Sequence, residues 1–287
     1  MKIVSFSLEA GNKYYGVIDG QRFYIGNRVS YEGGKGLMNT AGRTDQRYDR
    51  KLFRSQFGFW ADFIHPTAIA EGALYHTLNT YDRARFTFSF LQFAAHVPNG
   101  DFVIYFRKLL AQPLAAEYFP DLVLHQERIC KFTDGVPLPL ETDSSTMALM
   151  NYLNPSLTQV EDTEVIQSAK FIHWAQSDQA HQLIQISVGV EYAKVKMADY
   201  ARSYQLDGVR DVICLVVADI RHQGRAKNPE IITALRTKKP LEALLEIGES
   251  LYRERIAVLR REIKALVADG TFGNRTYSMS NRDFVVS

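Results

Sequence analysis

Two carboxylates in the stretch 62–96 occupy contrasting settings. Ile64, Ala68 and Glu71 fall at i, i+4 and i+7, which places Glu71 at the end of an apolar helical face, whereas Asp82 lies in a polar turn. A carboxyl group in apolar surroundings can protonate a leaving oxygen, while a solvated carboxylate stays ionised. The pair therefore predicts glycoside hydrolysis, with inversion where the two groups lie about 6.5 to 9.5 Å apart. Taken singly, Glu71 also fits a surface helix end, and Asp82 fits an ordinary turn residue.

A helix and a hairpin must hold these two carboxylates. Pro66 suits the first turn of the helix, and Gly72 ends it. After the turn, phenylalanines alternate with Thr87, Ser89 and Leu91 at period two, which predicts a β-hairpin. Four neighbouring side chains are candidates for contacts with sugar rings and hydroxyls: Asn79, Tyr81, Arg83 and Gln92. Phe86 and Phe88 could line the same groove, and the alternative is that Phe86, Phe88 and Phe90 pack the hairpin onto the core.

The order of these features resembles the lysozyme-like superfamily, which includes phage lysozymes, goose-type lysozymes, lytic transglycosylases and bacterial chitosanases. The resemblance covers residues 62–96: a glutamate at a helix end, a hairpin with an aspartate, and a threonine in the run Phe-Thr-Phe-Ser-Phe-Leu-Gln. It implies a helical body with a catalytic β-hairpin. It also implies that Glu71 is the general acid, Asp82 the candidate base, and Thr87 the hydroxyl that holds the attacking water.

One departure concerns the Gly-x-x-Gln motif of the goose-type and transglycosylase branch. Gln92 is the counterpart of the motif's glutamine, but Ser89 stands where a glycine is usual. The resemblance therefore does not identify the branch. It also leaves open whether the activity is changed or lost. The run Ala-Asp-Ile-Arg-His-Gln-Gly at 218–224 is similar to a helix-end Asn/His-Gly signature of some members. This second similarity implies that His222 lies on a groove wall.

The first 50 residues are predicted to form a small antiparallel β-meander and a linker. Asp19-Gly20 between two β-rich runs is a strong hairpin signal, and the runs cover 2–8, 14–18 and 22–25. The glycine-rich polar stretch 31–49 is predicted to be an exposed connector.

Residues 51–287 are predicted to form one lysozyme-like helical domain, so the fold class is α+β and predominantly α-helical. A proline-rich loop is expected at 136–140. Apolar periodicity and capping residues predict helices over 102–110, 147–153, 161–175, 177–203, 206–223, 229–236 and 240–268.

Composition narrows the function further. The chain has 287 residues and a net charge of +2, which gives no global field for nucleic acid. Its longest uncharged apolar run, Val212 to Ala218, is far shorter than the roughly 20 residues of a membrane helix. No signal peptide is expected at the N-terminus, and Cys130 and Cys214 are expected to be reduced core thiols. The histidines show no metal-ligand spacing, and neither a metal nor a cofactor is predicted. The sequence also contains no elbow motif of a serine nucleophile.

The sequence thus predicts a bacteriolytic, muramidase-like hydrolase that cleaves β-1,4 bonds of an amino-sugar polymer, with cell-wall peptidoglycan as substrate. A chitosanase-type hydrolase is the alternative on the same fold. A second alternative is a non-catalytic saccharide-binding or structural protein of a phage or secretion apparatus. The expected partner is a polysaccharide, without nucleic acid or membrane insertion, and the oligomeric state is left open. Synthesis in the cytoplasm is expected, with release by a holin, an injection machine or lysis.

Overall fold

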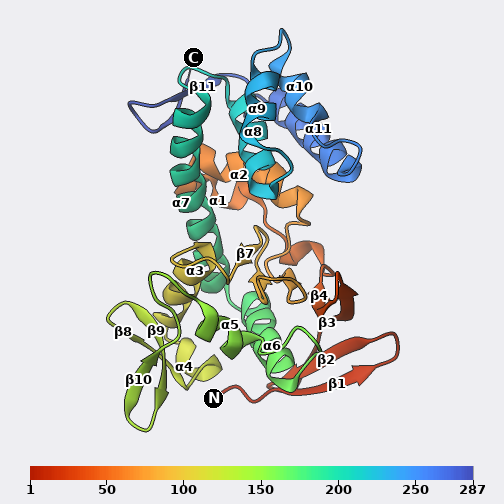
Figure 1. Cartoon of the computed structure of the whole chain (residues 1–287), viewed down its shortest axis with the longest axis vertical. Helices are drawn as coiled ribbons and strands as arrows, with labels where there is room; N and C mark the ends of the chain where they lie inside the picture. Colours follow the sequence, from red (N-terminus) through yellow and green to blue (C-terminus); the bar gives the residue numbers. More distant parts are fainter. Residues whose placement is uncertain (287) are drawn as a thin grey trace. The chain divides into compact units, whose positions relative to one another are not determined.

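A computed structural model of the chain describes residues 1–286 (Figure 1). The chain forms two compact units. The first unit contains residues 1–48 and 71–188, and the second contains residues 49–70 and the chain from Gly189 onward. The change from one unit to the next at residues 48/49 lies near the predicted boundary at 50. The predicted division into 1–50 and 51–287 nevertheless differs from these units, because the chain returns to the first unit at Glu71.

An antiparallel sheet runs through the first unit, and its strands follow one another in chain order (Figure 1). The predicted meander is confirmed by its first three strands, and the sheet continues through four more. The strands are β1 (Ser5–Glu9), β2 (Lys13–Ile18), β3 (Gln21–Tyr31), β4 (Gly34–Asn39), β5 (Leu78–Asn79), β6 (Thr87–Phe88) and β7 (Phe93–Ala94).

Strand β4 corrects the expectation of an exposed connector over residues 31–49. The glycines of β4 allow the strand to pack closely and do not make the chain flexible. A Cβ atom on Gly36 would lie 2.6 Å from Oγ1 of Thr80, and one on Gly34 would lie 2.0 Å from the carbonyl oxygen of Tyr81. Only glycine lets β4 approach the backbone beside β5 this closely.

A second, three-stranded antiparallel sheet in the first unit consists of β8 (Leu122–His125), β9 (Arg128–Thr133) and β10 (Val136–Pro139). Strand β10 corrects the loop predicted at 136–140. It pairs only with β9 and lies at the edge of the sheet, where prolines are tolerated because the outer N–H groups have no ladder partner.

Helices complete the first unit: the short 3-10 helix η1 (Thr44–Gln46), α3 (Asp101–Leu110), α4 (Ala115–Tyr118), α5 (Met147–Leu153), α6 (Asp162–Ser177) and the first part of α7 (Gln179–Tyr204). Their core is an aromatic cluster. Phe171 on α6 lies 5.2 Å from Phe86 and 5.3 Å from Phe88 between ring centroids. Phe86, Phe88 and Phe90 are fully buried, so they pack the hairpin onto the core and do not line a groove.

The second unit contains α1 (Arg50–Phe57), α2 (Phe59–Ala70), the rest of α7, α8 (Asp211–Gln223), α9 (Asn228–Leu235), α10 (Pro240–Glu246), α11 (Arg253–Ala268) and the hairpin β11 (Arg275–Ser278) and β12 (Asp283–Val286). Together the two units confirm the mixed α+β class. The single helix predicted over 240–268 is two helices, because Gly248 between them has a left-handed φ of 75°.

Pro66 lies inside α2 and not in its first turn as predicted. The helix begins earlier because Trp60 and Phe63 pack together, with ring centroids 5.2 Å apart, and Phe63 packs against Phe284. Tertiary packing of this kind overrides the helix-start signal that proline gives. Cys130 and Cys214 are both buried and are not joined in a disulfide. No helix within residues 1–286 has the length and apolar character needed to cross a membrane.

Candidate functional site

Glu71 directly follows α2 and begins the first unit's second segment. The chain then turns through Gly72 and Ala73, which have left-handed φ values of 90° and 59°, so Gly72 ends the helix as predicted. The Gly72 carbonyl oxygen accepts a hydrogen bond from Nη1 of Arg47 at 2.6 Å, and that of Ala73 accepts one from the Tyr48 amide at 2.8 Å. These bonds hold the backbone that carries the half-buried Glu71.

Strands β5, β6 and β7 place two predicted site residues on one face. Asn79 pairs with Thr87, and Thr87 pairs with Ala94. The neighbouring row consists of Leu78, Phe88 and Phe93, which are buried in the core. Because alternate residues of a strand point to opposite faces, Asn79 and Thr87 project together from the other face. Thr87 is 6% exposed, and Asn79 is half-buried.

The carboxylate of Asp82 organises the turn between β5 and β6. Oδ1 accepts a hydrogen bond from the Ala84 amide at 2.9 Å, and Oδ2 accepts one from Nδ2 of Asn79 at 3.1 Å. Oδ1 of Asn79 in turn accepts from the Tyr81 amide at 3.2 Å. Asn79 was predicted to contact substrate. In the structure its side chain bonds to Asp82, and its backbone pairs with that of Thr87 across β5 and β6. An ionised carboxylate has about four acceptor positions, so Asp82 keeps capacity for a water molecule.

Ser89 and Gln92 have unusual backbone conformations. Ser89 has a φ of 88°, which is in the left-handed region that favours glycine. Gln92 has a φ of 56°, and its side-chain Nε2 donates to the carbonyl oxygen of Ser89 at 2.9 Å. Ser89 therefore keeps the conformation that a glycine would permit at the first position of a Gly-x-x-Gln motif.

The remaining predicted residues have different surroundings. Tyr81 is half-buried, with its ring 5.9 Å from that of Tyr31, and Arg83 is exposed. His222 lies in the last turn of α8, which Gly224 ends with a left-handed φ of 74°, as the helix-end signature predicts. It belongs to the second unit, and its predicted place on a groove wall stays a prediction.

Glu164 is a buried carboxyl group beside the Asp82 turn that the sequence did not indicate. Glu164 in the first turn of α6 is fully buried, and its Oε1 accepts a hydrogen bond from Oγ1 of Thr80, the residue after Asn79. Burial raises the pKa of Glu164 to about 7, although the bond from Thr80 opposes this. Acidic residues are common in exposed first turns of helices, so the sequence carries no signal of its burial.

Within residues 1–286, no group of three or more histidine, cysteine, aspartate or glutamate side chains is arranged to hold a metal ion. No known protein family, curated protein or solved structure matches the chain.

Proposed function

We propose that the protein is a glycoside hydrolase that cleaves β-1,4 bonds of an amino-sugar polymer, with Glu71 as the general acid. The observation that carries this proposal is the order of Glu71, directly after α2, and three short antiparallel strands that display Asn79 and Thr87 on one face. Glycosidases need an acid held by the fold and a second polar group that directs water. Here Glu71 at the helix end is the proposed acid, and Thr87 on the strand face is the proposed polar group that directs water.

In the proposed reaction, the carboxyl group of Glu71 gives its proton to the glycosidic oxygen as the bond from that oxygen to the anomeric carbon breaks. A water molecule attacks the anomeric carbon from the opposite face of the sugar, and Asp82 accepts the proton that this water loses. The Thr87 hydroxyl orients the same water. Asn79 keeps Asp82 in place through the bond from Nδ2 to Oδ2.

The backbone of Ser89 supports the resemblance to lysozyme-like proteins. A φ of 88° at Ser89, with Gln92 bonded back to its carbonyl oxygen, fits a Gly-x-x-Gln turn in which serine replaces glycine. A non-glycine residue in this region is strained by about 1 kcal/mol or more, so serine keeps this turn at a cost in stability. We infer that residues 89–92 form a lysozyme-like Gly-x-x-Gln turn with serine at its first position.

Peptidoglycan is the favoured substrate because exposed Arg83 beside Asp82 suits an anionic glycan. Its neighbour Arg85 contributes less to this preference. Nη1 of Arg85 donates to Oδ1 of Asn151 at 2.6 Å and to the carbonyl oxygen of Pro155 at 3.1 Å, so this side chain is engaged within the fold. Chitosan, which is cationic, is the alternative polymer.

The deciding experiment measures reducing ends released from purified peptidoglycan and, in parallel, from chitosan. Wild type is compared with Glu71→Gln and with Glu254→Gln, a matched change at an exposed position of α11. Loss of the general acid should lower the rate about 10²- to 10⁴-fold, while Glu254→Gln leaves it unchanged. Activity on chitosan alone would identify the chitosanase-type alternative. No release by folded wild type from either polymer would reject the proposed hydrolase.

A further inference from the structure

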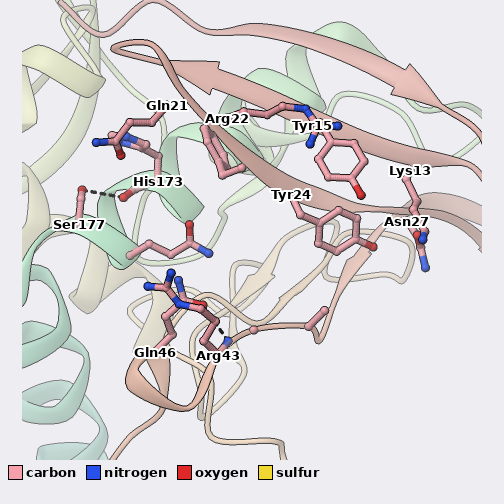
Figure 2. A pocket seen from close by; sticks show the side chains of 14 residues that line it. Lys13, Tyr15, Gln21, Arg22, Tyr24, Asn27, Arg43, Gln46, His173 and Ser177 are labelled. Atoms are coloured by element: carbon pink, nitrogen blue, oxygen red, sulfur yellow. Dashed lines mark hydrogen bonds between the residues drawn. The ribbon is translucent and has the colours of Figure 1, made fainter.

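A large cleft lies in the first unit, between strands β2 and β3, the segment 41–46 and the C-terminal end of α6 (Figure 2). Its volume is about 910 Å³, at the upper end of the range for ligand pockets. Hydrogen bonds to the rest of the first unit hold the segment 41–46, one wall of the cleft, in place. The Gln46 carbonyl oxygen accepts from the Tyr75 amide at 3.1 Å, and the Ala41 carbonyl oxygen lies 3.0 Å from Nε2 of His76.

Two tyrosines form an aromatic platform in this cleft. Tyr15 and Tyr24 are partners across β2 and β3, with ring centroids 5.5 Å apart, and both are half-buried. Arg22 covers one ring, its guanidinium carbon 3.8 Å from the centroid of Tyr15. Figure 2 shows both phenol oxygens directed toward the end of the cleft where Lys13 and Asn27 lie. Half-buried rings with polar tips suit ligands that have both apolar and hydroxyl-bearing faces.

The charge of the cleft is positive. Lys13, Arg22 and Arg43 contribute to the lining, and among the described residues no carboxylate does. Arg22 is paired with Glu9 and Arg43 with Asp45, outside the lining, and exposed pairs of this kind are weak. Lys13 makes no ion pair with any residue between 1 and 286, so its charge is available to a ligand.

Amide groups complete the lining and offer both donors and acceptors. They belong to Gln21, Asn27, Gln46 and Gln176. Oδ1 of Asn27 is buried and has no hydrogen-bond partner within the described part of the chain, which leaves an acceptor unsatisfied beside Lys13, its strand partner. A buried unpaired acceptor costs stability, and a ligand hydroxyl or amide would supply the missing donor.

We propose that this cleft binds an oligosaccharide that carries a carboxylate. A sugar ring lies against Tyr24, beside the Tyr15 ring that Arg22 covers, the carboxylate pairs with Lys13, and the amides bond to hydroxyl and acetamido groups. Aromatic rings, amides and the unpaired charge of Lys13 together recognise a polyhydroxylated acid better than they recognise a simple anion. The inference does not depend on the catalytic role of Glu71, since none of its evidence comes from the hairpin.

Calorimetric titration of the full chain with two matched tetrasaccharides tests this site. One is the neutral tetramer of N-acetylglucosamine, and the other alternates N-acetylglucosamine with N-acetylmuramic acid, which adds a lactyl carboxylate to every second ring. Titrations use Glu71→Gln protein to prevent turnover, with a wild-type titration of the neutral ligand for comparison. The acidic ligand should bind at least about fivefold more tightly at low salt, and this difference should shrink as salt is raised.

Variants assign the binding to the cleft. Lys13→Gln should remove the preference for the acidic ligand, and Tyr24→Ala should weaken both ligands about tenfold. Tyr24→Phe keeps the ring and should retain most of the affinity, while Lys238→Gln, an exposed lysine in the second unit, should change nothing. Equal affinity for the two ligands, or absence of binding, would overturn the proposal. So would affinities that Lys13→Gln and Tyr24→Ala leave unchanged. Tighter binding of a single-stranded oligonucleotide of equal charge would also overturn it. Loss of hydrolysis with intact binding would count only against the catalytic proposal.

Discussion

The Thr80 hydroxyl bonds to Oε1 of Glu164, and both side chains are fully buried. The same Oγ1 accepts a hydrogen bond from the Leu37 amide at 2.6 Å, and the Thr80 carbonyl oxygen accepts one from Nδ2 of Asn154 at 2.8 Å. This contact thus ties β4, the start of the Asp82 turn, α6 and the residue after α5 together. Oε2 of Glu164 has no partner among the described residues, which suits a carboxyl group that is protonated when the protein is folded.

Glu164 should make stability fall as pH rises. Burial raises its pKa from 4.5 to about 7, so the folded state holds a proton that the unfolded state releases between these values. Its contribution is complete below pH 4.5 and is lost as pH rises through 7, by up to about 3 kcal/mol in the free energy of unfolding. Urea denaturation from pH 4 to 8 should show this loss in wild type, relative to Glu164→Gln. Parallel profiles for the two proteins would contradict it.

His181 should act in the opposite direction. It is fully buried against Tyr105, with Nε2 2.5 Å from the phenol oxygen, and burial lowers its pKa from 6.5 to about 3. The unfolded state then binds a proton that the folded state rejects. Stability from this group is therefore complete above pH 6.5 and is lost as pH falls toward 3, by up to about 5 kcal/mol in the free energy of unfolding.

The double variant His181→Phe with Tyr105→Phe removes both polar partners, which costs less than leaving one of them unpaired. Urea denaturation between pH 3.5 and 7 should then show a shallower loss of stability at low pH than wild type. His125→Gln, at an exposed position of β8, serves as the control and should follow wild type. An unchanged slope in the double variant would show that His181 is not the titrating group.

The second unit depends on a buried ion cluster. Asp219 on α8 accepts hydrogen bonds from Nη1 of Arg225 at 2.5 Å, from Nη2 of Arg255 at 2.7 Å and from the Thr67 hydroxyl at 2.9 Å. Burial alone would raise the pKa of Asp219, but Arg255 and Arg225 outweigh it and lower this pKa. The carboxylate is the counter-charge that makes two buried guanidinium groups tolerable.

Replacing that carboxylate should therefore be costly. Asp219→Asn should lower the free energy of unfolding by about 3 to 5 kcal/mol, because it removes the carboxylate that neutralises the fully buried guanidinium of Arg225. The control is Glu242→Gln, which breaks the exposed pair with Arg260 and should cost less than about 1 kcal/mol. Thermal and urea denaturation compare the two. A similar small effect for both variants would show that the cluster contributes no more than a surface pair.

Local signals were sufficient for several elements. The helix expected over 147–153 is present with the same bounds, because its signals are local: Oγ of Ser145 accepts a hydrogen bond from the Met147 amide at 3.2 Å, and the apolar face lies within the segment. The turn at Asp82 was predicted from residue types that bond to their own backbone, and Asp82 does so with the Ala84 amide. Where sequence neighbours alone determine the conformation, the sequence predicts the structure.

Other features depend on residues far apart in the chain. Gly36 suggested a loose connector, but its role is to admit Thr80, which the sequence does not place beside it. Glu164 has the sequence setting of an exposed helix start, but it is fully buried and its carboxyl group bonds to the same Thr80. At the candidate site, residue types predicted Thr87 and Asn79, but their pairing across β5 and β6 required the register of the sheet.

The proposed roles of Asp82 and Thr87 can be separated by paired variants. Asp82→Asn keeps an oxygen for the Ala84 amide but loses the carboxylate that Asn79 contacts, so it should cost about 1 kcal/mol in stability and about 10²-fold or more in the rate of glycan cleavage. Thr87→Val keeps the shape of the side chain and removes only its hydroxyl. It should lower the rate about tenfold, and Thr87→Ser should restore most of this loss because it returns the hydroxyl. Rates are measured on peptidoglycan, with folding checked by urea denaturation. Full activity in Asp82→Asn would leave Asp82 as a turn residue only, and an unrestored rate in Thr87→Ser would mean that packing of the Thr87 methyl group, not its hydroxyl, supports the site.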